Sequence, residues 1–430
     1  MMNLGLTKKE RNWVLYDVGN SAFTLIISTI MPIYFKYLAG KEGLDSVTYM
    51  AYWGYAASIA TIIVALLGPV FGTLADTKGF KKPIFTVSLV IGALGCISMG
   101  FAKQWLLFLV IFVIAKVGYS CSLIFYDSML SDVTTLERMD QVSSSGFAWG
   151  YVGSCVPFAV CLVIVLGSGV FELGLDQAMM ISFAIVGIWW VAMTCPLLKG
   201  YQQKYYVERE KHAVAQSFCR LGRTFKNVRK DKKIFLFLIA FFFYIDGVYT
   251  IIDMATAYGS ALGLQSTGLL LALLVTQLVA FPFAILFGRL AAKFRTEKLI
   301  TICIIAYLGI AIFAMFLKTQ GQFWALAIFV GMFQGGIQAL SRSYYTKIIP
   351  SEQSGEYFGL LDICGKGASF AGTTFVSVVS QLTGDVNEGV GMIAVLFVIG
   401  LFFFRMASGN NSHAVTKKPA YTALAKDQAI

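Results

Sequence analysis

The sequence has 430 residues, of which 57% are hydrophobic and only 13% are charged, and its formal net charge is +11. Soluble domains average about 45–50% apolar and about 25% charged residues. This composition therefore excludes an ordinary cytosolic enzyme and a disordered chain, and it indicates an integral membrane protein.

Twelve apolar runs follow along the chain, each close to the roughly 20 residues that a tilted membrane-spanning helix needs. They cover about 12–38, 50–74, 83–102, 105–127, 142–168, 178–198, 234–258, 266–290, 299–317, 322–345, 356–382 and 389–407. The runs are continuous, whereas strands of a membrane barrel alternate apolar and polar residues. We expect an all-α integral membrane fold with twelve transmembrane helices in two six-helix, pseudo-symmetric halves.

The long polar break between the sixth and seventh runs divides the chain. We expect a first six-helix bundle over 1–198, a basic central loop over 199–233, a second bundle over 234–407 and a polar tail over 408–430. If the N-terminus is inside, the outer loops hold only four basic residues, namely Lys36, Lys41, Lys103 and Lys318. The positive-inside rule then predicts that both termini, the central loop and the tail lie in the cytoplasm. We expect the protein in the plasma membrane.

The same distribution explains the net charge without a nucleic-acid partner. The eight cysteines form no CxxC pair, and the two histidines lie in polar segments, so we expect neither a metal site nor a cofactor. The sequence contains no Walker-type loop that would indicate ATP use, and its spans contain no nucleophile–base pair that would indicate an enzyme. We expect a monomer whose partners are the bilayer and a small-molecule solute.

A basic turn after the second run carries the strongest short motif, Gly72-Thr-Leu-Ala-Asp76-Thr-Lys-Gly79-Phe-Lys81-Lys82. Small residues allow a tight turn, and an Asp can meet a helix N-terminus or an Arg. The motif resembles the signature loop of the major facilitator superfamily, which implies that Gly72, Asp76, Gly79 and Lys81 form a conformational latch. A second copy begins at Gly288, but Ala292 stands in place of the Asp, so we expect a weaker second latch.

Five further segments narrow the resemblance. They are 13–23, 143–154, 242–251, 334–344, and 358–359 with Gly365 and Lys366. Together they look like the autophagy-related vacuole-effluxer family within that superfamily, whose fungal members are associated with amino-acid export from the vacuole. One residue departs from the pattern, because Asp127 stands where the family is expected to have Asn.

Charges inside the spans are costly, at about 2.5 kcal/mol or more each, and they usually face a partner or a water-filled cavity. Helices 1, 4, 7 and 10 line the central cavity in the fold that the chain resembles. The charges lie on these helices and on the neighbouring helix 11: Asp17, Lys116, Asp127, Asp246, Asp253, Arg342, Asp362 and Lys366.

Three of these charges, Lys116, Asp246 and Lys366, fall near the middle of their spans, where transporter sites lie. We expect them to bind a zwitterion, with a lysine facing a carboxylate and Asp246 facing an ammonium group or exchanging a proton. The alternative is a static salt bridge between the halves. Further candidates for the site are Asn20, Tyr244, Tyr249 and Trp149, whose alternative is simple packing between helices.

Four charges lie nearer the cytoplasmic ends: Asp17, Asp127, Arg342 and Asp362. They form either an inner gate of salt bridges or interfacial groups that reach water. The basic run from Arg220 to Lys233 predicts an amphipathic helix on anionic headgroups.

The leading hypothesis is therefore a secondary transporter of a small polar solute that works by alternating access. Amino acids are favoured by the family resemblance alone, while the direction of transport, including efflux, and proton coupling stay open. The alternative is a lipid or lysolipid flippase of the same fold.

Overall fold

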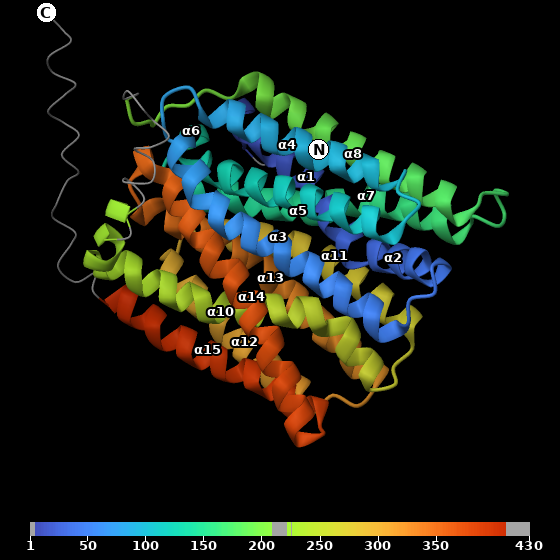
Figure 1. Cartoon of the computed structure of the whole chain (residues 1–430). Helices are drawn as coiled ribbons and strands as arrows, with labels where there is room; N and C mark the ends of the chain where they lie inside the picture. Colours follow the sequence, from blue (N-terminus) through green and yellow to red (C-terminus); the bar gives the residue numbers. More distant parts are fainter. Residues whose placement is uncertain (1–4, 209–221, 225, 410–430) are drawn as a thin grey trace, which may run out of the picture.

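The computed structural model describes residues 5–208, 222–224 and 226–409, and these residues are almost entirely helical (Figure 1). In chain order the elements are α1 (Lys8–Ser28), α2 (Ile30–Lys41), α3 (Ser46–Ala75), α4 (Lys81–Met99), α5 (Trp105–Ser128), α6 (Leu130–Val133), α7 (Met139–Leu166), α8 (Leu175–Gly200), α10 (Lys232–Ala261), α11 (Ser266–Leu290), α12 (Thr296–Ala314), α13 (Gln320–Ile348), the 3-10 turn η1 (Ser351–Gln353), α14 (Ser354–Thr383) and α15 (Val386–Gly409).

Every one of the twelve predicted runs is helical. Ten helices of the described chain are long and apolar enough to cross a membrane, and α1 with α2 forms an eleventh span bent by 41°. The bend lies at Thr29, just before Pro32, which has no N–H to donate to the carbonyl of Ser28 and whose ring displaces that carbonyl. The Thr29 hydroxyl donates to the carbonyl of Leu25 at the same place. The remaining run, 356–382, is α14, a single helix of 30 residues that lies outside this count. The predicted all-α membrane fold is confirmed.

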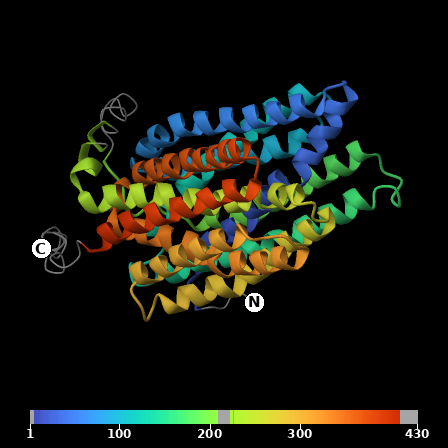
Figure 2. The same ribbon diagram turned by 90° about the horizontal axis from the view of Figure 1, so that it is seen from below.

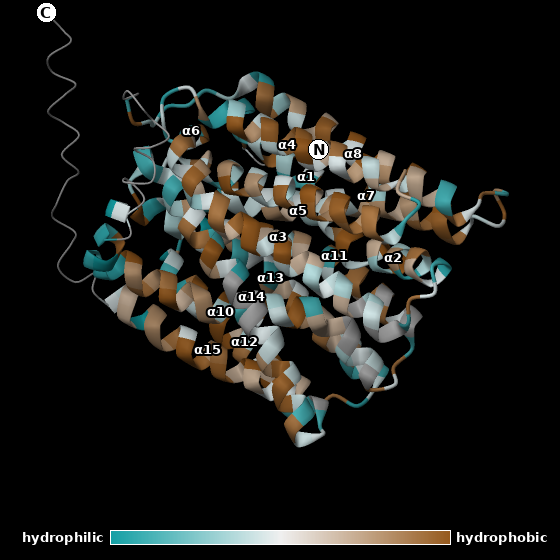
Figure 3. Cartoon of the chain, in the orientation of Figure 1, coloured by the Kyte–Doolittle hydropathy of each residue, from teal (hydrophilic) through white to brown (hydrophobic). Residues whose placement is uncertain are grey.

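Apolar side chains cover the outside of the bundle. Exposed examples are Ile62, Leu66, Leu94 and Phe402, and Figure 3 shows hydrophobic residues along the outer faces of the helices. A hydrocarbon environment explains these exposed side chains, because water does not favour such an extensive apolar surface.

Polar residues gather at the end of the bundle beside α6, which we call the latch end. It holds the loop 76–80 between α3 and α4, residues 201–208 and 226–231 of the central segment, and the last turn of α15. The described N-terminus lies there too, since Arg138 Nη2 donates to the carbonyl of Gly5 at 2.7 Å.

The helices before the central segment, α1–α8, form the N-terminal group, and α10–α15 form the C-terminal group. The groups meet along two seams, where α3 packs against α14, and α7 packs against α11 and α13. Figure 2 shows α14 between α3 and α10. At the first seam a Cβ on Gly72 would overlap the carbonyl of Gly355, so glycine is needed for the backbones to touch.

Some predicted features lie outside the described residues. These are Arg220, His212, Cys219 and the tail from residue 410 onward. Of the predicted amphipathic helix, residues 226–230 are helical.

Candidate transport site and its closure at the latch end

Arg342 of α13 joins the two groups of helices near the latch end. Its Nη1 donates to Asp127 of α5 at 2.9 Å, and its Nη2 donates to Asp17 of α1 at 3.2 Å. Its Nε donates to the hydroxyl of Ser143 on α7 at 2.9 Å, and Nη2 also reaches the carbonyl of that residue at 3.0 Å. The planar guanidinium can serve several acceptors at once, which a lysine ammonium does less well.

Aromatic rings and a glycine shape the space around this guanidinium. Arg342 lies over the rings of Trp13 at 4.6 Å and Phe147 at 4.3 Å, and it is only 5% exposed. A Cβ on Gly146 would overlap the Asp17 carboxylate and crowd Arg342 Nη2 at 3.0 Å. Glycine at position 146 therefore leaves the space that the Asp17–Arg342 ion pair occupies.

Three of the four predicted gate residues, Asp17, Asp127 and Arg342, come together in this cluster. The fourth, Asp362 of α14, instead forms an ion pair with Lys366 one turn later on the same helix, at 2.6 Å. Asp362 nevertheless exerts its charge on Asp127, so the two groups are electrostatic neighbours. The role of all four as a gate stays a prediction.

Lys116 of α5 is half-buried deeper in the bundle. The charges that act on it are Asp253 of α10 and Lys366 of α14. Its described contact is the ring of Phe112 at 5.7 Å, and the described part of the chain gives its ammonium no ion pair. Lys116, Asp253, Asp362 and Lys366 are thus electrostatic neighbours on helices of both groups, and Asp362 links them to Asp127 of the Arg342 cluster. We call these four residues the polar cluster.

Asp246 of α10 lies elsewhere, against α14. It is fully buried, and its Oδ1 accepts from the backbone N–H of Gly372 at 3.1 Å and from the Thr250 hydroxyl at 3.2 Å. Its Oδ2 has no hydrogen-bond partner in the described part of the chain. The charges of Lys116 and Lys366 therefore act on one another, whereas Asp246 lies in a separate helix contact.

The uncharged candidates also occupy different places. Asn20 is buried and donates to Asp17 at 3.4 Å, while Tyr244 is fully buried and shares a hydrogen bond of 2.7 Å with Ser341 of α13. Trp149 packs edge-on against Phe281 of α11 at 5.3 Å. Tyr249 is half-buried, and the charges of Asp127, Asp253 and Asp362 act on its hydroxyl group. The role of these four side chains in binding a solute stays a prediction.

The latch loop docks on the first turn of α14. Asp76 accepts from the backbone N–H groups of Gly355 at 2.8 Å and Glu356 at 2.9 Å. This carboxylate acts as a cap on a helix N-terminus that belongs to the other group of helices. Gly79 has a φ of +81°, which favours glycine in this turn.

Lys81 reinforces the same contact from a fully buried position. Its ammonium donates to Ser354 at 2.9 Å and lies 3.6 Å from both Asp76 and Asp132. Asp132 is itself held by the Tyr201 hydroxyl and by the backbone N–H of Lys204. The buried lysine is thus paired, as a charge in such a position requires.

A second connection between the groups was not predicted from the sequence. Asp140 of α7 forms an ion pair with Lys347 of α13 and accepts from the hydroxyls of Ser343 and Thr296. A signal was available in the sequence. The second copy of the motif has no Asp at position 292, and Asp140 is an acidic residue in the first turn of α7, in the other half of the chain. Together with the Arg342 cluster and the Asp76 contact, this network holds the two groups together at the latch end.

The described residues contain no group of three or more His, Cys, Asp and Glu side chains that could hold a metal ion. The candidate site in the described part of the chain is built from charged and aromatic side chains.

A family model described as "Vacuole effluxer Atg22 like" matches residues 7–135 and 131–414 of this chain. The Bacillus subtilis (strain 168) protein named "Uncharacterized MFS-type transporter YxiO" is 40% identical over 417 residues, which cover 96% of this chain and 97% of that protein. Autophagy-related protein 22 of Cryptococcus neoformans var. neoformans serotype D (strain B-3501A) is 24% identical over 64% of this chain. That match spans only 53% of the fungal protein.

Solved structures of major facilitator transporters share the fold. The transporter FucP in the outward conformation superposes with a TM-score of 0.70 at 13% identity, covering 94% of this chain and 99% of that one. The human organic anion transporter MFSD10 gives a TM-score of 0.68 at 12% identity, covering 93% and 100%. At such low identity the likeness shows the fold alone.

Proposed function

Because the chain belongs to the vacuole effluxer Atg22-like family of major facilitator transporters, we propose that it moves a small polar solute across the membrane as a secondary active transporter. Amino acids are the favoured solutes, and export from the cell is the favoured direction. The protein works as a monomer in the plasma membrane, with the latch end and both termini in the cytoplasm.

The observation that carries this proposal is the position of Lys116. A half-buried ammonium within a membrane span, with no described ion pair, is costly unless a function maintains it. A solute carboxylate would satisfy it. Asp253 acts electrostatically on the same lysine and would face the ammonium group of an amino acid.

Alternating access fits the contacts at the latch end. The Arg342 cluster, the Asp140 network and the Asp76 contact each join the two groups of helices there. We propose that these contacts break together when the cytoplasmic side opens, so that the groups rock around the polar cluster.

Proton coupling is assigned to Asp246. A carboxyl group can take up and release a proton, and Asp246 Oδ2 lies buried without a hydrogen-bond partner in the described part of the chain. The contact of its other oxygen with Gly372 would pass a change of protonation to α14. Asp246→Asn should then abolish accumulation driven by a proton gradient while leaving exchange of solute intact.

Counterflow in proteoliposomes tests the proposal. Vesicles are loaded with an unlabelled amino-acid mixture and receive trace labelled amino acids outside. We expect accumulation of label above that of protein-free vesicles, and a loss of about tenfold or more in Lys116→Met, because hydrogen bonds to charged groups contribute about 1.5–3 kcal/mol.

Lys103→Met is the matched control, because this exposed lysine lies in the loop between α4 and α5, away from the polar cluster. It should transport like the unmodified protein. Folded, inserted protein that gives no counterflow with any amino acid would refute the amino-acid assignment. Equal activity in the two lysine variants would refute the role of Lys116.

A lipid or lysolipid flippase is the second candidate, and an apolar cavity of about 670 Å³ between α10 and α14 favours it. The same vesicles can carry a fluorescent lysolipid whose outer-leaflet pool is chemically quenched. A protein-dependent rise in the quenched fraction would support the flippase.

A further inference from the structure

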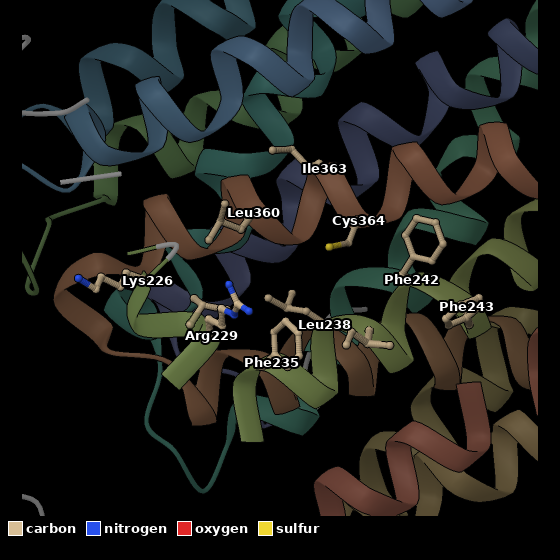
Figure 4. A pocket seen from close by; sticks show the side chains of 11 residues that line it. Lys226, Arg229, Phe235, Leu238, Phe242, Phe243, Leu360, Ile363 and Cys364 are labelled. Carbon is tan, nitrogen blue, oxygen red and sulfur yellow. The ribbon is translucent and has the colours of Figure 1, made fainter. Parts of the chain in front are cut away.

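An apolar groove opens between α10 and α14 next to the latch end (Figure 4). Its volume is about 670 Å³, and its walls include Phe235 and Phe242 of α10 and Ile363 and Cys364 of α14. Lys226 and Arg229 of the central segment complete it at the latch end. We call this feature the α10–α14 groove.

The groove is elongated along the helices. From Phe235 to Phe243, α10 rises about 12 Å, at roughly 1.5 Å per residue. Phe243 also lines a second apolar cavity of about 200 Å³, formed with α14 and α15 residues such as Phe375 and Leu396. An apolar path therefore continues along α10 and α14 from one cavity to the other, and Phe235 and Phe375 on its walls are exposed on the outside of the helices.

The two basic residues distinguish this groove from ordinary lipid-facing surface. Lys226 and Arg229 are three residues apart in a helical stretch, so they lie on one face of it. In Figure 4 the guanidinium of Arg229 lies beside the mouth of the groove. Both side chains are exposed, and the described part of the chain gives neither an ion pair.

A hydrocarbon groove alone does not select an occupant within a bilayer, because acyl chains are as apolar as the side chains that they would contact. The basic residues supply the selection, since Lys and Arg at the membrane surface attract anionic lipids. Arg in particular binds phosphate through two parallel hydrogen bonds. The combination fits a phosphate group with a long apolar chain attached.

We propose that the α10–α14 groove binds an anionic glycerophospholipid of the bilayer, with its phosphate on Lys226 and Arg229 and one acyl chain along Phe235–Phe243. The lipid connects the central segment to α10 and α14. Because α14 begins at the N–H groups that Asp76 holds, a lipid seated there stabilises the closed latch end.

Native mass spectrometry of the full-length protein tests the site, with phosphatidylglycerol and phosphatidylcholine offered at equal concentration. We expect selective retention of phosphatidylglycerol, weakened by roughly 25-fold in Lys226→Ala with Arg229→Ala, at about fivefold per basic residue. The matched control is Arg223→Ala with Lys230→Ala, which removes two exposed charges from the same segment but none from the groove.

A third variant, Ile239→Trp, places a large ring in the groove and keeps both charges, so it should also lose the lipid. Retention unchanged in Lys226→Ala with Arg229→Ala would overturn the proposal. So would an equal loss in the control pair, because the attraction would then be spread over the whole segment. Equal retention of both lipids would overturn the role of the headgroup.

Discussion

Asp140 of α7 and Lys347 of α13 form an ion pair between the two groups of helices. This contact differs from the Asp76 contact in the place of its carboxylate, which lies on a helix and not on a loop. In the Asp76 contact the carboxylate lies on the loop after α3 and caps α14 of the other group. In the second half of the chain Ala292 occupies the corresponding loop position, and the carboxylate lies instead on α7, facing Thr296 and α13. Both seams are therefore closed by a carboxylate, contributed both times by the N-terminal group.

The Asp140–Lys347 pair should be energetically coupled. Asp140 is largely buried, at 8% side-chain exposure, so removing Lys347 alone leaves a charge without its partner. In a double-mutant cycle with Asp140→Asn and Lys347→Met, we expect a coupling of about 1–2 kcal/mol, within the range of contacting residues. Thermal unfolding in detergent measures it.

The control cycle uses Lys41→Met and Asp176→Asn, an ion pair whose side chains are 46% and 48% exposed. Its coupling should stay below about 0.5 kcal/mol, because exposed pairs contribute little. Similar coupling in both cycles would contradict the structural role given to Asp140.

Asp76→Asn should loosen the first turn of α14. The amide keeps one acceptor oxygen, but it places an N–H₂ donor against a backbone N–H and removes the charge that favours a helix N-terminus. We expect a loss of about 0.5–2 kcal/mol. Hydrogen–deuterium exchange of a peptide covering 354–360 should speed up accordingly, whereas Asp176→Asn should leave this peptide unchanged. Full protection of the Gly355 and Glu356 amides in Asp76→Asn would argue against the cap.

Arg342→Lys should open the latch end even though it keeps the charge. A single ammonium cannot reach Asp17, Asp127 and Ser143 together, and these three acceptors surround the guanidinium. Spin labels at the exposed residues Lys82 of α4 and Lys298 of α12 report the separation of the groups. We expect a longer distance distribution in Arg342→Lys and a still longer one in Arg342→Gln. Identical distributions in all three proteins would rule out Arg342 as a gate.

Gly146→Ala should destabilise the closed form by about 1–3 kcal/mol, the usual effect of overpacking. The new methyl group would overlap the Asp17 carboxylate and push Arg342 away. Gly309→Ala is the matched control, because this glycine lies inside α12 with open space around its Cβ position. There alanine should be neutral or stabilising by up to about 1 kcal/mol through helix propensity. The melting temperatures of the two variants should therefore move in opposite directions, and equal shifts would contradict the packing argument.

The apolar runs and the Gly72–Lys82 motif were sufficient to predict the membrane fold and its superfamily, and the five further segments narrowed the prediction to the family. Each run encodes its own helix, since a spanning segment must satisfy its backbone hydrogen bonds internally. The bend at Thr29 was not predicted from the apolar run, although Pro32 in that run was a signal for it, because proline removes one helical hydrogen bond and displaces the carbonyl one turn earlier.

For the candidate site, too, the sequence predicted one part and the tertiary structure decided the other. The sequence by itself determined which charges lie within the spans, because their cost in hydrocarbon depends only on position along a helix. Only the tertiary structure decided their partners. Arg342 forms ion pairs with Asp17 and Asp127 across the seam. Asp362 forms an ion pair with Lys366 on its own helix, and Asp246 accepts a hydrogen bond from the N–H of Gly372. Side-chain partners depend on how the helices rotate and pack against one another. Small residues such as Gly146 and Gly72 allow the close contacts, but which surface each of them contacts is decided only by the tertiary structure.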